Sequence, residues 1–147
     1  MITKKENHSN GEMAEMLTSL EKILEKATGM FGYATARNAR ELRNGCMEFL
    51  AERERLAGEY GNKNEETGEV TIDIDSENFR KFVKLLQPFS EIRHDVEITR
   101  ISHKDLPPDM NALEILQILW MVEDSANEEW LKEATGAAGE EGGNAVL

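Results

Sequence analysis

Three carboxylates at alternate positions, Asp73, Asp75 and Glu77, are of the residue type that a hard metal cation prefers. Such a cation needs several oxygen ligands that converge on one point, as in the calcium-binding loop of an EF-hand. A loop of that kind starting at Asp73 would need glycine at position 78 and glutamate at position 84, where the chain has Asn78 and Lys84. We therefore interpret the acids as solvent-facing side chains of a strand and of the next helix N-terminus, where the helix dipole favours them. No metal or other cofactor is expected.

A nucleophile, a base and an acid also occur close together, at Ser90, His94 and Asp95. A catalytic triad further needs an oriented base and an oxyanion hole, and closeness in sequence supplies neither. The single cysteine, Cys46, lies on the apolar stripe of a helical segment. We expect it to be a small buried side chain, with a reactive thiol as the alternative. The sequence therefore predicts a protein that is not an enzyme.

The charge of the chain argues against direct binding of nucleic acid. Seventeen basic and 29 acidic side chains give a formal net charge of −12, and an acidic surface repels phosphates. From Asp105 to the C-terminus there are ten acidic residues and one basic residue, Lys132, so these 43 positions carry −9. Such a segment is either a solubilising surface or a set of carboxylates that imitate nucleic-acid phosphates in a basic groove of a partner protein.

The candidate partner-binding residues fall into a basic group and a group in the last third of the chain. Arg37, Arg40 and Arg43 stand three positions apart and so line one helical face, where they meet the protein's own carboxylates or an acidic patch of a partner. The second group is apolar and acidic: Trp120, Met121, Glu123, Asp124, Glu128 and Glu129. The partner is expected to be another protein.

The spacing of apolar residues predicts two amphipathic helices, at residues 13–31 and 39–60, which fold back on each other as a helical hairpin. Gly29 and Gly32 weaken helical continuity between them, since each glycine costs about 1 kcal/mol relative to alanine. Gly61 and the polar residues after it end the second helix.

Alternating apolar residues predict two short strands, at residues 70–75 and 96–101. Ser76 is placed to cap a helix between them, and Pro88 should end or kink that helix near Gln87. A parallel pair of strands with a right-handed crossover satisfies this order. Two strands alone are marginally stable, so completion of the sheet across a homodimer is a second arrangement that the sequence allows.

Residues 112–122 are apolar at nine of eleven positions, with Asp109 or Asn111 as the expected cap. A helix that is apolar nearly all round is either central to the core, which would bury Leu116, or half core and half interface. A last short helix is expected at residues 127–135.

The whole pattern predicts one α+β domain, mostly helical, at residues 11–135: a helical hairpin, a small two-stranded β element and a central apolar helix. Residues 1–10 should form a flexible N-terminus and residues 136–147 a disordered acidic tail. The polar start is unlike a signal peptide. The longest apolar run, residues 118–122, is far below the roughly 20 residues of a membrane span. We expect a cytoplasmic protein without a membrane partner.

The run from Ala36 to Asp124 resembles a group of short proteins from tailed phages and prophages, a domain of unknown function. The segments that carry the resemblance are EYGNKNEETGEVTID, SENFRKFVKLL, VEITRI and LPPDMNALEILQIL. The resemblance implies a phage or prophage origin and a non-enzymatic role in the host cell. The expected function is binding of a host or phage protein, as an inhibitor of a host enzyme or antiviral defence system; the alternative is a structural or assembly factor of the phage particle.

Overall fold

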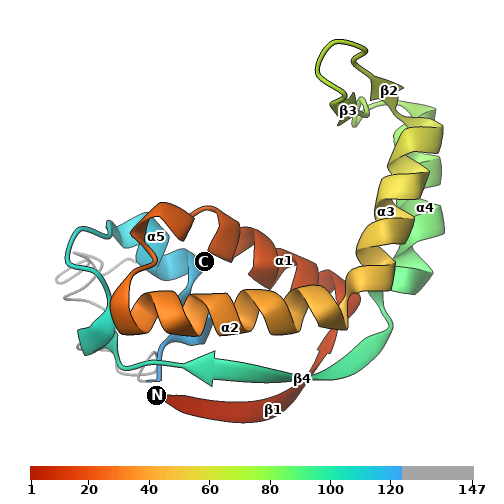
Figure 1. Cartoon of the computed structure of the whole chain (residues 1–147). Coiled ribbons are helices and arrows are strands. Elements are labelled where there is room, and N and C mark those ends of the chain that lie inside the picture. The colour runs from red at the N-terminus through yellow and green to blue at the C-terminus, as the bar shows by residue number, and fades with distance from the viewer. Residues whose placement is uncertain (124–147) are drawn as a thin grey trace, which may run out of the picture.

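The computed structural model describes residues 1–123, which form a body and a projecting arm (Figure 1). The helices are α1 (Asn10–Glu21), α2 (Gly29–Gly45), α3 (Met47–Tyr60), α4 (Glu77–Ser90) and α5 (Ala112–Gln117), and the strands are β1 (Ile2–Ser9), β2 (Asn62–Lys63), β3 (Val70–Thr71) and β4 (Arg93–Arg100). The body contains α1, α2, α5, β1 and β4, and the arm contains α3 and α4 with β2 and β3 at its tip. The mostly helical α+β class predicted from the sequence is confirmed.

The sheet of the body is formed by β1 and β4, which pair antiparallel from Ile2 opposite Arg100 to Ser9 opposite Arg93. Two predictions are therefore wrong: residues 2–9 are not a flexible N-terminus, and the strand at 96–101 does not pair with residues 70–75. β1 escapes sequence analysis because most of its side chains are exposed and polar. Backbone hydrogen bonds to β4, which leave no periodic signal, hold it in place.

The predicted strand at 70–75 is reduced to Val70–Thr71, which pairs with Asn62–Lys63 in a small hairpin at the tip of the arm. Ile72 is half-buried and Ile74 is 70% exposed. The alternation of side chains is present in the sequence, but the segment lies at the end of the arm, where the body cannot cover it (Figure 1).

The predicted helical hairpin is present as α1 and α2, with different bounds. α1 ends at Glu21, and α2 begins at Gly29, whose φ of 60° is a left-handed value that favours glycine. The predicted second helix is split at Cys46, which has non-helical backbone angles and directs the chain from α2 into α3. A Cβ at Gly45 would lie 3.0 Å from the sulfur of Met13, so glycine permits the close approach of α2 to α1 here.

Two predicted caps are confirmed. The Ser76 side chain accepts a hydrogen bond from the Phe79 amide at 3.1 Å, and Asn111 forms a capping box with Glu114. Of the two effects predicted for Pro88, an end of the helix near Gln87 is wrong, because α4 continues through Pro88 to Ser90. The residues predicted as a last helix, 127–135, and as the tail, 136–147, lie outside the described residues.

The apolar segment 112–122 forms α5 and a single 3-10 turn, Leu119–Met121. Ile115 and Ile118 are buried, whereas Leu113 and Leu116 are 64% and 49% exposed. The expected burial of Leu116 is therefore wrong. The segment has one face in the core and one apolar face exposed, so the first of the two arrangements, burial on all sides, is wrong.

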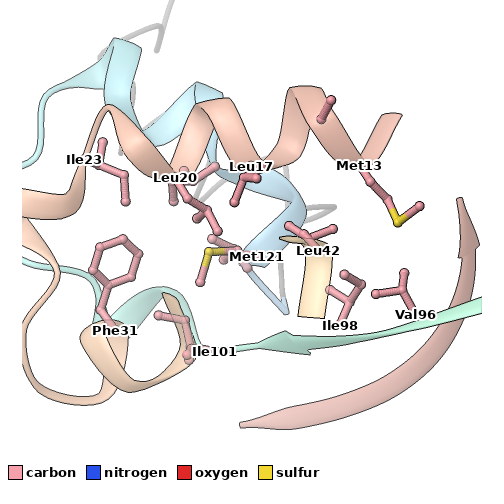
Figure 2. Close-up of a cluster of buried hydrophobic side chains, with 14 of the residues drawn as sticks. Met13, Leu17, Leu20, Ile23, Phe31, Leu42, Val96, Ile98, Ile101 and Met121 are labelled. Carbon is pink, nitrogen blue, oxygen red and sulfur yellow. The ribbon is translucent and has the colours of Figure 1, made fainter. Parts of the chain in front are cut away.

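The core of the body lies between α1, α2, β4 and the segment that follows α5 (Figure 2). Its largest buried side chains include Met13, Leu17, Leu20, Ile23, Phe31, Leu42, Ile98, Ile101 and Met121. Cys46 is also buried, as predicted, and burial raises the pKa of its thiol. Within residues 1–123, no helix combines the length and apolar character that crossing a membrane requires.

A buried amide joins α2 to the sheet. The side chain of Asn38 is fully buried; its Nδ2 donates to the Thr99 carbonyl and its Oδ1 accepts from the Thr99 amide, both at 2.8 Å. These backbone groups of Thr99 point away from β1, so Thr99 and its partner Thr3 are a cross-strand pair without backbone hydrogen bonds to each other. In such a pair of an antiparallel sheet the two side chains lie close together. The two hydroxyl oxygens are indeed 2.9 Å apart. Asn38 therefore takes the place of a third strand at this point of β4.

We predict that Asn38→Ala lowers the free energy of unfolding by about 2–6 kcal/mol, because each of the two orphaned backbone groups costs about 1–3 kcal/mol. Chemical denaturation followed by circular dichroism measures the loss. The matched control is Asn44→Ala, which removes an exposed amide from the same helix and should change stability by less than about 0.5 kcal/mol. Equal stability of the two variants would contradict this role of Asn38.

Candidate functional site

The three arginines predicted as a basic stripe on α2 have different surroundings. Arg37 is half-buried, and its Nη1 lies 3.5 Å from the Tyr33 hydroxyl, which accepts a hydrogen bond. Arg40 lies with its Nε 4.0 Å from the carboxylate of Glu41. Arg43 lines a hollow between α1 and α3. The described structure therefore brings Arg43, but not Arg37, to a concave surface.

The predicted candidates in the last third also separate. Met121 is fully buried in the core, so its prediction as a partner-contacting residue is wrong. Trp120 is half-buried, and its Nε1 donates to the Ser19 hydroxyl at 3.1 Å. Glu123 lies 3.2 Å from the amino group of Met1. Three further candidates lie outside the described residues: Asp124, Glu128 and Glu129.

Three hollows lie side by side across α1 and together form one surface, which we call the α1 groove. The first, of about 440 Å³, is lined by Gly11, Ala14, Glu15, Thr18, Ser19, Lys22, Phe49, Arg53, Leu86 and Gln117. It shares Glu15, Ser19 and Gln117 with a second hollow of about 310 Å³ that contains Trp120. It shares Ala14, Thr18 and Arg53 with a third of about 360 Å³ that contains Arg43. Arg43 and Trp120, 77 positions apart in the sequence, thus line the two outer hollows, which the first hollow separates.

The floor of the α1 groove exists because α1 carries small side chains on its outer face. Gly11, Ala14 and Thr18 follow the spacing of three and four that places residues on one helical face. The bases of α3 and α4 form one wall, through Phe49 and Leu86, and the end of α5 forms the other. The spacing of small residues in α1 can be read from the sequence. It is overlooked when only the apolar residues of the helix are considered.

The two ends of the α1 groove carry charges of both signs. Arg43 and Arg53 stand near Glu21 and Glu54 at one end. His8, Glu12, Glu15 and Arg100 stand at the other. Between these ends the first hollow combines small and apolar side chains with the charged Glu15, Lys22 and Arg53, so the groove fits a ligand that has apolar groups and charges of both signs better than a ligand of one charge.

His8 is held between two carboxylates at one end of the α1 groove. Its Nε2 lies 2.9 Å from Glu6 and its Nδ1 lies 3.1 Å from Glu12. Partial burial opposes the charged imidazole, but the hydrogen bonds to Glu6 and Glu12 outweigh it and raise the pKa of His8 above 6.5. The hydrogen bonds from His8 and from the Ser9 amide lower the pKa of Glu12 to about 2. Glu6 is paired in turn with Arg100, so the cluster joins β1, β4 and α1.

The groups considered for catalysis or metal binding have other structural partners. Ser90 donates to the Gln87 carbonyl at 2.8 Å, and Asp95 accepts from the Asn7 side chain at 3.0 Å. Asp73 accepts from the Asp75 amide at 3.0 Å, which forms the turn before α4. Within the described part of the chain, no group of three or more His, Cys, Asp or Glu side chains is arranged to hold a metal ion.

The comparisons with known proteins identify no relative of this chain: no protein-family model matches it, and searches of curated proteins and of solved structures find no match. A functional assignment therefore rests on the chemistry of its own surfaces.

We predict that the stabilising contribution of His8 is present at acidic pH and lost as the pH rises. Because the pKa of His8 is higher in the folded state than in the unfolded state, protonated His8 contributes its full stabilisation at pH values below the unfolded-state pKa near 6.5. This contribution is lost as the pH rises through the folded-state pKa. Its size should stay below about 1 kcal/mol, because the pair partners are partly solvated. Thermal unfolding of wild type and His8→Gln should converge above that pKa. An NMR titration of the His8 ring with a midpoint at or below 6.5 would contradict the raised pKa on which this prediction rests.

Proposed function

We propose that this protein acts by binding another protein and that the α1 groove takes a segment of that partner. The supporting observation is that Arg43 and Trp120 line the two outer hollows of the α1 groove, on either side of the first hollow. Tryptophan and arginine are the residue types that most often dominate the energy of a protein interface. A groove that has both at its ends, and that combines small, apolar and charged side chains between them, offers the mixture of apolar and polar contacts found in protein interfaces.

The role that we propose for this binding is inhibition of a host enzyme or antiviral defence system by a small acidic phage or prophage protein. The resemblance over residues 36–124 supports the origin, and the concentration of negative charge after Asp105 supports a contribution from presented carboxylates. A second candidate role is assembly of the phage particle. The exposed apolar side chains of Leu113 and Leu116 favour it, because association during assembly relies on apolar area.

The α1 groove is tested by filling it. Thr18 is exposed at its floor, so Thr18→Trp blocks the groove without removing a core side chain. We expect this variant to lose at least about tenfold, or about 1.4 kcal/mol, in affinity for the partner that copurifies with wild type. Thr71→Trp is the matched control, because Thr71 is an exposed threonine at the tip of the arm. Full binding by Thr18→Trp would exclude the groove as the binding site.

The two roles differ in their response to salt. Exposed charge pairs are screened over about 8–10 Å at physiological ionic strength, so inhibition through carboxylates should weaken steeply between low and moderate salt. Replacement of Glu123, Asp124, Glu128 and Glu129 by lysine should then abolish binding while the circular dichroism spectrum is preserved. A flat salt response together with full binding by the four-lysine variant would contradict inhibition through carboxylates and favour assembly.

A further inference from the structure

The arm has an apolar surface that the described part of the chain leaves uncovered. α4 is amphipathic, yet none of its residues is buried. Val83, Leu85 and Phe89 are 43%, 45% and 41% exposed, and Ile92, just after the helix, is 48% exposed. Two helices side by side can cover only one flank of each other, and the arm projects from the body, which covers no more than its base (Figure 1).

The apolar residues along one side of α4 and just after it follow a pattern that suits another helix. The half-buried Phe82 and the exposed Leu85, Phe89 and Ile92 stand at spacings of three, four and three, which is the spacing of the seam of a coiled coil. We call these four residues the α4 stripe. Phe79, Phe82 and Leu86 are the half-buried apolar side chains of α4, which packs beside α3. Leu85, Phe89 and Ile92 therefore form a second, exposed seam beside the half-buried one, with Phe82 at the border between the two.

The charges of the arm identify what can cover the α4 stripe. α3 carries four glutamates and two arginines, a net charge of −2, and α4 carries one glutamate and three basic residues, a net charge of +2. When two arms pair about a two-fold axis with α3 of one beside α4 of the other, opposite charges face each other at both contacts. The surface of the arm is thus complementary to a second copy of itself.

We propose that two copies of this chain associate through their arms, with the α4 stripes packed together in a four-helix bundle. Such a bundle buries the apolar residues that a lone helical hairpin leaves exposed. This pairing uses the α4 stripe, whose four residues do not line the α1 groove, so it stands or falls separately from the proposed function.

Sedimentation equilibrium of the full chain tests the pairing. Wild type should have twice the chain mass of 16.6 kDa from the micromolar range upward, and its melting temperature should rise with concentration, because the dimer is linked to folding. Leu85→Glu should sediment as a monomer, since the substitution places a carboxylate in the seam. Leu113→Glu is the matched control, an exposed leucine of another helix, and should remain dimeric.

Circular dichroism must show equal helix content in both variants. If Leu85→Glu loses helix, the proposal is tested by the mass of the wild-type protein and by the concentration dependence of its melting temperature. A monomeric wild type at submillimolar concentration, with a melting temperature independent of concentration, would overturn the proposal. It would assign the α4 stripe to residues 124–147 or to a different protein. A dimeric Leu85→Glu variant with full helix content would equally exclude the arm as the interface. Loss of partner binding by Thr18→Trp with an unchanged dimer would leave the two proposals separate.

Discussion

The body of this protein depends on the pairing of the Asn38 side chain with both backbone groups of Thr99. A two-stranded sheet is marginal by itself, and β4 has an inner edge that must be satisfied away from water. At Thr99 the Asn38 amide satisfies that edge from the middle of α2, at 2.8 Å for each bond, and at Ile101 the Met121 carbonyl and the Glu123 amide do so. One helix can thus cover the strand and also complete its hydrogen bonding at Thr99, so the apolar core forms directly between α2, α1 and β4.

The placement of the two candidate interaction surfaces follows from this arrangement. The arm leaves the body at Cys46, after α2, and returns immediately before β4, so both of its ends are attached to elements that Asn38 joins. Asn10 closes the base: its amide donates to the Ile92 carbonyl and its side chain donates to the Phe89 carbonyl. The α1 groove lies beside this junction, because α1 begins there.

The α4 stripe and the α1 groove differ in the way that permanent and transient protein interfaces differ. The α4 stripe consists of large apolar side chains in a regular seam, as in permanent helical interfaces. The α1 groove has small residues at its floor and charges of both signs at its ends, as in contacts that form and dissociate. A protein built in this way can stay paired through one surface while it binds and releases a partner through the other.

The sequence by itself determined the mostly helical α+β class, the caps at Ser76 and Asn111 and the burial of Cys46, because apolar periodicity and capping are local properties of the chain. It could not show β1, whose polar side chains pack against no core and whose stability comes from backbone bonds to a strand about 90 positions away. Nor could it separate buried Met121 from half-buried Trp120, or show that Arg43 and Trp120 line hollows on either side of the same stretch of α1. Those features were decided by the tertiary structure. The periodicity of a helix shows which of its side chains should be buried, whereas the path of the whole chain decides which residues pack against them.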